Sequence, residues 1–520
     1  MEVLMNSSTD LARSFIRYLI ENGVSDFVLS PGSRNAPLSI ALNEAFEKGF
    51  VDLHIKIDER GAAYFALGIS KATDNYVAVI CTSGTAAANF APAALEALHG
   101  QNKLLLITAD RPLRLRKTGA NQTTNQVDIY QDIKSHDLNV FQPIDLIEGP
   151  VHLNLQFDEP LIPSENSNWL EGVSKNEIRK FGVKREKLSV TGNGLVIIGH
   201  DRGGFSSAEI ENFAQNLPII SEDPLSFKSA IPHASIFLAD EKVCDYLKPD
   251  YVLVIGRTTL SRSINSFINT ATQQYIVDKR VKTIDTKRSG TKLFENLPEL
   301  EVTDVAESYR RDLELASKNS NLTLTWSEQL FAQIFAKELP EESAVFVGSS
   351  RPIRDIEGFA SPRSNISVFA NRGLAGIDGN LSTVFGISEH FRETFAVIGD
   401  LTFLHDLTAL IDPTKNNCKI FVVDNDGGGI FSTLPQSGVQ GFERIFGTPH
   451  GKEIEKIIEG FGVAVEVIKG ESDLLRAIAH KNTGLKIYLV KVPNREDMAQ
   501  NLKEIYAKAS SAVRIGFNLA

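Results

Sequence analysis

The sequence predicts an α/β protein with mostly parallel sheets, because of the way in which its predicted strands and helices alternate. Short apolar runs rich in β-branched residues alternate with segments of helical spacing along almost all of the 520 residues. Such alternation is typical of βαβ units, in which consecutive strands run in the same direction. At roughly 150 residues per domain, a chain of this length is expected to form about three domains.

The composition narrows the class of protein. The chain carries 54 basic and 65 acidic residues, a formal net charge of −11, which argues against nonspecific binding to nucleic acids or acidic membranes. Its three cysteines lie far apart in the sequence and predict neither a disulfide framework nor a zinc cluster. The start lacks the zones of a signal peptide, and no apolar run approaches the ~18 residues of a membrane span. We therefore expect a cytoplasmic protein.

The first third begins with a strand, a turn and a helix. In FVLSPGSRNAPLS an apolar run ends in a Pro-Gly turn, and a helical pattern starts at Pro37, which suits a first helical turn. Ligands of open α/β sheets bind beyond the carboxyl ends of such strands, so Arg34 is a candidate binding residue. The other predicted strands are 51–58, 76–82, 103–110 and 151–157, and the predicted helices include 59–73 and 85–98.

Polar and charged sequence at 164–187 predicts a linker, and a softer boundary falls at 317–325. We therefore expect domains at 1–185, 186–320 and 321–520. The middle block holds predicted strands at 194–200, 251–257 and 274–279, and the last block at 343–350, 365–373, 393–400, 418–426 and 485–492. The patterns of the first and last blocks suggest two versions of one sheet architecture.

A metal site is predicted where two strands of the last block end. One strand ends at Asp400, a helix crosses over, and the next strand ends at Asn425. If these parallel strands are neighbours, their carboxyl ends lie together. A carboxylate, an amide oxygen and a free carbonyl at Gly427 form an oxygen-only set that suits Mg²⁺ with phosphate and water. The glycines that follow allow the backbone to approach an anion and to present N–H groups to it.

This spacing resembles the thiamin-diphosphate (ThDP) motif of 2-oxoacid decarboxylases and carboligases. The resemblance implies that Asp400, Asn425 and the Gly427 carbonyl hold the metal, Mg²⁺ or Mn²⁺, which anchors the diphosphate. It also implies that Gly428, Ile430 and Phe431 contact the cofactor. The family often has glycine after the aspartate, whereas this chain has Leu401.

An enzyme of this kind also needs a carboxyl group against the aminopyrimidine ring of ThDP. A hydrogen bond from this group favours the imino tautomer, which can remove the proton from the thiazolium carbon. Glu59 follows a predicted strand and opens a helix rich in small residues, IDERGAAYFALGISKA, which resembles the glutamate helix of the family. A glutamate in a first helical turn is also favoured by the helix dipole alone. Together with the metal motif, Glu59 is the candidate catalytic residue.

Four further stretches resemble the 2-succinyl-5-enolpyruvyl-6-hydroxy-3-cyclohexene-1-carboxylate synthase family of menaquinone biosynthesis: SPGSRNAPLSIAL, TADRPLRLRKTGANQTTNQ, GSSRPIRD and ANRGLAGIDGNLST. The resemblance covers essentially the whole chain and is weakest in the middle. It implies a pyrimidine domain, a central domain and a diphosphate domain. It further implies decarboxylation of 2-oxoglutarate, addition of the product to isochorismate, and a homodimer or homotetramer with cofactor sites between subunits.

The two substrates bring four carboxylates, and arginine suits their bidentate binding. By motif match, the substrate-binding residues are Arg34, Arg111, Asn121, Gln122, Arg262, Ser350, Arg354 and Arg372. Arg262 stands where the family usually has a lysine. Ile377 in GIDGN is expected to support the bent form of the cofactor. We expect Arg114, Arg116 and Lys117 to form a solvated basic face.

Three other functions compete with this interpretation. A pyruvate-using ThDP carboligase or decarboxylase, similar to acetolactate synthase, would not need so many arginines at strand ends. A nicotinamide dehydrogenase is suggested by GLVIIGHDRGG, but its glycines do not form G-x-G-x-x-G after the strand. A binding protein without activity is disfavoured because Glu59 and the metal residues are both present.

Overall fold

The computed structural model describes residues 7–146, 149–164, 167–174, 185–280, 289–304, 306–320 and 322–519. The chain divides into two compact units. Unit 1 comprises Met1–Lys180, Asn371–Arg392 and His405–Asn416, and unit 2 comprises Phe181–Ala370, Glu393–Leu404 and Asn417–Ala520. Half of the predicted linker at 164–187 lies outside the described residues, and the division into three domains stays a prediction. Among the described helices, none is both long and apolar enough to cross a membrane.

Unit 1 is built on a six-stranded parallel sheet with the order β2-β1-β3-β4-β6-β5. Its strands are β1 (Asp26–Leu29), β2 (Asp52–Ile55), β3 (Val77–Cys81), β4 (Leu104–Asp110), β5 (Lys134–Leu138) and β6 (Val151–Gln156). The central strands β3 and β4 are buried at every position, as expected for parallel strands covered on both faces. All of them were predicted except β5, which is partly exposed along its length.

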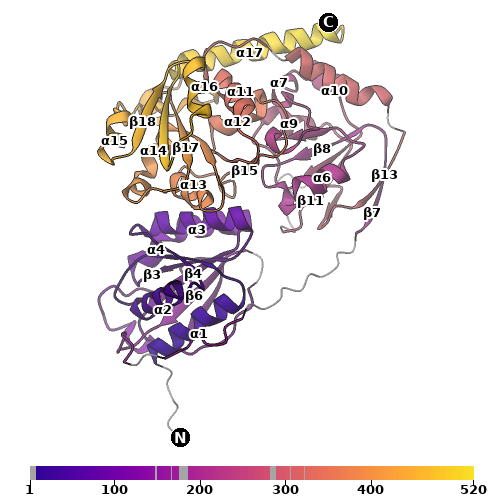
Figure 1. Cartoon of the computed structure of the whole chain (residues 1–520). Helices are drawn as coiled ribbons and strands as arrows, with labels where there is room; N and C mark the ends of the chain where they lie inside the picture. Colours follow the sequence, from indigo (N-terminus) through magenta and orange to yellow (C-terminus); the bar gives the residue numbers. More distant parts are fainter. Residues whose placement is uncertain are drawn as a thin grey trace. The chain divides into compact units, whose positions relative to one another are not determined.

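Helices cover both faces of this sheet (Figure 1). They are α1 (Ser8–Glu21), α2 (Ala36–Glu47), α3 (Glu59–Thr73), α4 (Thr85–Asn89) and α5 (Ala91–Gly100). From later in the chain, α13 (Asn380–Ser388) packs against α3. The prediction of one helix over 85–98 is wrong, because the helix ends at Asn89 and a new one begins at Ala91. Pro92 explains the break, since proline has no N–H to donate and is favoured in a first turn.

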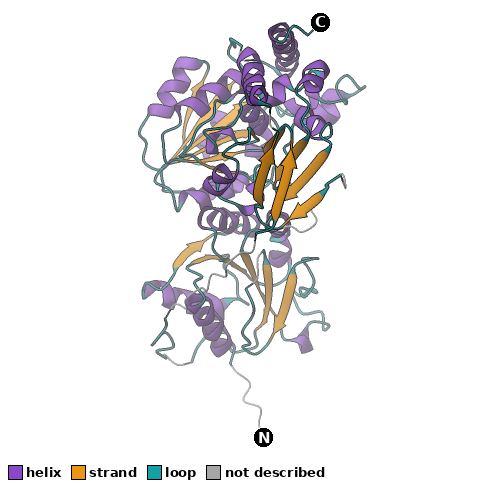
Figure 2. Ribbon diagram, turned by 90° about the vertical axis from the view of Figure 1, so that its right-hand side faces the viewer, coloured by secondary structure: helices purple, strands orange, loops and turns teal. Residues whose placement is uncertain are grey.

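Unit 2 contains two parallel sheets and a two-stranded ribbon, shown with their covering helices in Figure 2. The first sheet has the order β12-β11-β10-β8-β9. Its strands are β8 (Gly194–Ile198), β9 (Ile219–Ser221), β10 (Tyr251–Ile255), β11 (Gln273–Val277) and β12 (Lys292–Phe294), and the ribbon pairs β7 (Lys187–Thr191) with β13 (Glu299–Thr303). The four strands that were not predicted here are short or alternate with exposed positions.

The last sheet has the order β15-β14-β16-β17-β19-β18. If β14 to β19 are matched in sequence order with β1 to β6, this is the strand order of the first sheet. The strands are β14 (Ala344–Val347), β15 (Ser367–Phe369), β16 (Thr394–Gly399), β17 (Cys418–Asp424), β18 (Ala464–Ile468) and β19 (Leu485–Lys491). This confirms that the first and last blocks are two versions of one sheet architecture.

The helices of unit 2 flank these sheets (Figure 2). They are α6 (Ser207–Phe213), α7 (Ala234–Phe237), α8 (Glu241–Tyr246), α9 (Arg262–Ile268), α10 (Glu307–Ser320), α11 (Glu328–Glu338), α12 (Arg351–Phe359), α15 (Ile454–Gly460), α16 (Glu471–Ala479) and α17 (Arg495–Gly516). The short α14 (Asp400–His405) begins directly after β16, so the chain turns into a helix at the first predicted metal ligand.

The prediction of a solvated basic face at 114–117 is wrong for Arg116. Its side chain is 8% exposed and forms ion pairs with Asp110 at 3.0 Å and Asp137 at 2.7 Å. Arg114 agrees with the prediction, since its side chain is 62% exposed. The local sequence RPLRLRK shows only charge, whereas the two acids that bury Arg116 come from strands β4 and β5.

A buried acid in unit 1 is held by two histidines. Asp26 Oδ1 lies 3.6 Å from the Nε2 atoms of both His54 and His390. Burial acts to raise the pKa of Asp26, but the contacts with His390 and His54 outweigh it and lower the pKa. The contact between Asp26 and His390 raises the pKa of His390. Burial opposes this rise, and the negative charges of Glu389 and Asp52 add to it.

These opposite shifts predict a pH window for the ion pair. Because folding lowers the pKa of Asp26, the pair stabilises the fold above about pH 4, where the unfolded aspartate is also ionised. Because folding raises the pKa of His390, this stabilisation is complete below about pH 6.5 and is lost as the pH rises further. His390→Gln should therefore lower the thermal midpoint more at pH 5.5 than at pH 8.5. Because His390 is partly exposed, the effect should be about 1 kcal/mol or less. An equal loss at both pH values would contradict this assignment.

Candidate functional site

The predicted metal residues lie together at the ends of two neighbouring strands. Strands β16 and β17 pair in parallel, with Gly399 opposite Val423, so the expectation that these strands are neighbours is confirmed. Asp400 is 2% exposed, and its Oδ2 accepts a hydrogen bond from Gly427 N at 2.8 Å. Parallel pairing therefore brings the two ends of this βαβ unit into direct contact.

Asn425 offers a free oxygen at this point. Its Nδ2 donates to Glu328 Oε1 at 2.7 Å, whereas its Oδ1 is buried without a hydrogen-bond partner in the part of the chain that the structure describes. A buried polar atom without a partner is costly, and a cation would satisfy it. The Gly427 carbonyl is not free as predicted, because it accepts a hydrogen bond from Gly429 N at 2.9 Å. Its second lone pair is still able to bind a cation.

Two further residues join this group, and no local pattern in the sequence singles them out. Asp424 and His450 place ligand atoms within 4.8 Å of one another and of Asp400. His450 Nε2 lies 3.3 Å from Asp400 Oδ2 and 3.5 Å from Asp424 Oδ1. Burial raises the pKa of Asp400 to about 6; the two backbone N–H bonds and His450 oppose the rise, and the nearby Asp424 adds to it. This part of the molecule therefore attracts a cation.

The glycine run after Asn425 has a conformation that needs glycine. Gly427 has φ +130°, and a Cβ there would come within 2.3 Å of the Gly447 carbonyl. The prediction that this run presents free N–H groups to an anion is wrong. The N–H groups of Gly427, Gly428 and Gly429 donate to Asp400, Gly447 and Gly427 respectively. The predicted cofactor contacts Ile430 and Phe431 follow in a 3₁₀-helix, Gly429–Thr433, and both are partly exposed.

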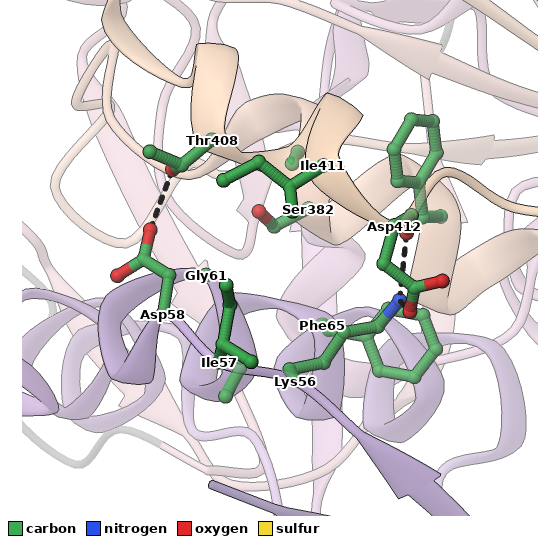
Figure 3. A pocket seen from close by; sticks show the side chains of 12 residues that line it. Lys56, Ile57, Asp58, Gly61, Phe65, Ser382, Thr408, Ile411 and Asp412 are labelled. Atoms are coloured by element: carbon green, nitrogen blue, oxygen red, sulfur yellow. Dashed lines mark hydrogen bonds and ion pairs between the residues drawn. The ribbon is translucent and has the colours of Figure 1, made fainter. Parts of the chain in front are cut away.

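Glu59 is the first residue of α3, as predicted. Its side chain is partly exposed, and Oε2 accepts a hydrogen bond from Asn89 Nδ2 at 3.3 Å. The turn before it is tied down on both sides of a small pocket (Figure 3). Thr408 donates to Asp58 at 2.5 Å, and Lys56 pairs with Asp412 at 2.7 Å. These contacts fix the point at which α3 begins, and so the position of the Glu59 backbone.

The GIDGN turn lies against the same helix. Tyr64 of α3 donates to Asp378 Oδ2 at 2.5 Å, and a Cβ on Gly379 would come within 1.9 Å of the Tyr64 ring. Gly379 has φ +63°, so glycine serves both the turn and the close approach. Ile377 precedes this contact and is 39% exposed. Within unit 1, the structure thus brings the turn that carries Ile377 to the helix that carries Glu59.

Two predicted arginines of unit 1 lie near each other. Burial lowers the pKa of Arg111, and the neighbouring positive charge of Arg34 lowers it further. Arg34 is held by the Phe157 carbonyl at 3.1 Å, and its Nε is buried with no hydrogen-bond partner among the described residues. Arg34 also pairs with the exposed Glu159 at 3.5 Å, so an anion that binds these two guanidinium groups would compete with this carboxylate.

The loop that carries Asn121 and Gln122 supports Arg111. Arg111 Nη1 donates to the Gln122 carbonyl at 2.8 Å and to Ser83 Oγ at 2.9 Å. Both predicted side chains, Asn121 and Gln122, are exposed. Arg372 is partly exposed and precedes a loop in which Gly373 N and Leu374 N each donate to the buried Glu96, at 2.7 Å. Glu96 therefore fixes the loop that follows Arg372.

Three predicted substrate residues belong to unit 2. Arg262 and Arg354 line one pocket of about 900 Å³. Arg354 Nη1 donates to the Ser350 carbonyl at 2.6 Å, and Ser350 has φ +74° at the start of α12. Arg262 is exposed at the start of α9. The metal residues and these three belong to unit 2, whereas Glu59, Ile377, Arg34, Arg111, Asn121, Gln122 and Arg372 belong to unit 1.

Comparisons with known proteins agree on one family. The family model "Thiamine pyrophosphate enzyme, N-terminal TPP binding domain" matches residues 9–130. A 2-succinyl-5-enolpyruvyl-6-hydroxy-3-cyclohexene-1-carboxylate synthase of Saccharopolyspora erythraea is 34% identical, over 98% of this chain and 99% of the relative. A relative with the same name from Thermobifida fusca is 32% identical, over 98% of this chain and 100% of the relative. Another from Lysinibacillus sphaericus is 35% identical, over 86% of this chain and 89% of the relative.

A solved structure is similar over almost the whole chain. Benzoylformate decarboxylase from Polynucleobacter necessarius aligns with a TM-score of 0.62 and 16% identity, over 93% of this chain and 98% of that chain. At this identity the similarity concerns the fold, which is shared with a known decarboxylase.

Proposed function

This chain belongs to the 2-succinyl-5-enolpyruvyl-6-hydroxy-3-cyclohexene-1-carboxylate synthase family, and we propose that it catalyses that synthesis in menaquinone biosynthesis. In the proposed reaction, 2-oxoglutarate loses CO₂ and the remaining succinyl-semialdehyde unit is added to isochorismate. The observation that carries the proposal is the buried Asp400 carboxylate beside the unpartnered oxygen of Asn425. A family that depends on ThDP needs such a set of oxygens to hold its metal.

The residues at the ends of β16 and β17 fit a divalent metal, which would in turn anchor a diphosphate. Asp400, Asn425 and the Gly427 carbonyl would hold Mg²⁺ or Mn²⁺, which are hard cations that prefer oxygen ligands. Gly428, Ile430 and Phe431 would line the cofactor next to the metal. When bound, ThDP supplies a nucleophilic carbon and an electron sink for the decarboxylation of a 2-oxoacid.

Glu59 is proposed to hold a proton against the aminopyrimidine ring. The contacts of Asp58 and Lys56 keep the start of α3 in place, so the carboxyl group reaches a defined position. Ile377 is an apolar side chain that is 39% exposed, and a bound cofactor would cover it. By family resemblance, Glu59 of one subunit and Asp400 of another serve the same cofactor in a homodimer or homotetramer.

Glu59→Gln should separate cofactor binding from cofactor activation. Glutamine keeps the size of the side chain but weakens the hydrogen bond to the ring, and the metal residues are untouched. ThDP should bind with unchanged affinity, whereas exchange of its C2 proton should slow by ~10²–10⁴-fold. Exchange is followed by NMR after acid quenching, with the exposed Glu47→Gln on α2 as control. Exchange at the wild-type rate would show that another group performs this role.

The arginines are proposed to bind the carboxylates of the two substrates. Arg34 and Arg111 form one group in unit 1, and Arg262 and Arg354 line one pocket in unit 2. Arg372, Ser350, Asn121 and Gln122 are proposed to complete the binding of the substrates. A guanidinium group that binds a carboxylate through two parallel hydrogen bonds fixes the orientation of the substrate, which directs the reacting carbons toward each other.

The proposed function predicts a preference among 2-oxoacids. Pyruvate and 2-oxoglutarate share the reacting end, but 2-oxoglutarate has a distal carboxylate for an arginine to bind. A charge-assisted hydrogen bond contributes about 1.5–3 kcal/mol, so a bidentate pair of such bonds should favour 2-oxoglutarate in kcat/KM by roughly 10- to 1,000-fold or more. The measurement follows isochorismate loss and CO₂ release with each 2-oxoacid in the presence of ThDP and Mg²⁺. Equal values, or a preference for pyruvate, would return the protein to the acetolactate-synthase-like carboligases.

A further inference from the structure

The amide of Asn425 has a fixed orientation, and a neighbouring acid sets it. Glu328 Oε1 accepts the hydrogen bond from Asn425 Nδ2 at 2.7 Å. Burial and the nearby Asp355 raise the pKa of Glu328 to about 7, and Arg351 opposes the rise. Above that pH the carboxylate is ionised and can only accept, so the amide turns its NH₂ group toward Glu328. The Oδ1 atom then faces away from Glu328, and this is the buried atom without a hydrogen-bond partner among the described residues.

Glu328 is itself held in place from two directions. It is the first residue of α11, where Ser327 caps the helix by accepting from Leu330 N at 3.2 Å. A carboxylate is favoured at this end of a helix. Its second oxygen, Oε2, lies 3.5 Å from Arg351 Nε, and both side chains are almost fully buried. One oxygen of Glu328 therefore faces an arginine, and the other faces the amide.

The space on the other side of the amide is also restricted. A Cβ on Gly429 would come within 2.4 Å of Asn425 Nδ2, so the backbone at this position packs closely against the NH₂ group. The amide lies between this backbone and the Glu328 carboxylate. Rotation to the opposite orientation would place the amide oxygen against a carboxylate, where the two oxygens repel.

A purely structural role must be distinguished from this one. Arg351 also forms an ion pair with Asp355, and Asp355 Oδ1 accepts from Gln329 Nε2 at 3.0 Å. Glu328 and Asp355 are thus two buried carboxylates on one arginine. Of the two, Glu328 alone has a hydrogen bond to Asn425 in the described part of the chain. This difference makes Asp355 a matched control.

We propose that Glu328 is a positioning residue, which holds the Asn425 amide with its oxygen available to the divalent metal. The inference rests on the proposed function, in which Asn425 is a metal ligand. In this inference Glu328 does not bind the metal itself, but it raises the affinity for the metal by orienting Asn425. The same helix that supplies Arg351, α12, also supplies Arg354 to the proposed substrate pocket.

The test uses Glu328→Gln in the full-length protein. Arg351 Nε can only donate, so it should take the glutamine oxygen and leave the glutamine NH₂ group facing Asn425. The amide of Asn425 should then turn over and present its NH₂ group to the metal. Loss of a residue that orients a ligand typically costs 10–100-fold in metal affinity, and we expect the Kd for Mn²⁺ to rise by about this factor. Mn²⁺ binding is measured by EPR with ThDP present, without any turnover.

Asp355→Asn provides the comparison. It also neutralises a buried carboxylate on Arg351 but leaves the Glu328–Asn425 hydrogen bond in place, so the Kd for Mn²⁺ should stay within about 2-fold of wild type. Equal effects of the two variants, or no effect of Glu328→Gln, would overturn the positioning role. If the wild-type protein with ThDP binds no Mn²⁺, the proposed function itself fails, and the inference fails with it.

A charge swap covers the case in which Glu328→Gln does not fold. The double variant Glu328→Gln/Asn425→Asp keeps the total charge of the pair. An aspartate has two accepting oxygens, so one can accept from the NH₂ group of the introduced glutamine while the other binds the metal, whichever way the aspartate turns. This variant should bind Mn²⁺ within about 3-fold of wild type. A folded double variant that does not bind Mn²⁺ would rule out the orientation argument.

Discussion

The site depends on one electrostatic constraint, the burial of Asp400 among other acids. Its carboxylate is 2% exposed, and Asp424 and Asp426 lie around the same His450 nitrogen. Like charges that are removed from water repel strongly unless a cation lies among them. The pKa of Asp400, raised by burial to about 6, expresses the same cost. In the proposed function, a divalent metal would relieve this cost, satisfy the Asn425 oxygen and create a positive centre for a diphosphate. The chemistry of the site thus follows from two strand ends that parallel pairing forces together.

The repeated sheet order explains how one chain supplies two kinds of binding residue. Both six-stranded sheets have the same order, so each provides strand ends and loops on the edge where ligands of α/β proteins bind. The first sheet provides Glu59 after β2 and Arg111 after β4, and the last provides Asp400 after β16 and Asn425 after β17. Arginines that follow these strands add positive charge in a protein whose net charge is −11. The negative net charge disfavours nonspecific binding to nucleic acids, and the arginines after these strands suit small anionic substrates.

The sequence predicted the residues whose position depends on local pattern. Asp400 and Asn425 follow strands that adjoin in a βαβ unit, so their spacing predicted that they lie close together. Glu59 opens a helix of small residues, and it was singled out by resemblance to the ThDP family together with the metal motif. His450 and Glu328 could not be predicted, because they reach the site through tertiary contacts from a loop and from α11. Arg116 was assigned to the surface for the same reason, since its partners Asp110 and Asp137 are distant in sequence. The break before Ala91 was missed although Pro92 signals it, and the short strands β9 and β12 were missed because three residues carry no periodicity.

The most direct test of the account is the linkage between metal and cofactor in the wild-type protein. Calorimetry gives the affinity for ThDP at increasing Mg²⁺ and with EDTA, and the affinity for Mg²⁺ with and without ThDP. If Asp400 and Asn425 hold a metal that anchors the diphosphate, each ligand should raise the affinity for the other, and by the same factor. ThDP should bind weakly or not at all in EDTA. An affinity for ThDP that does not depend on a divalent metal would contradict the central claim.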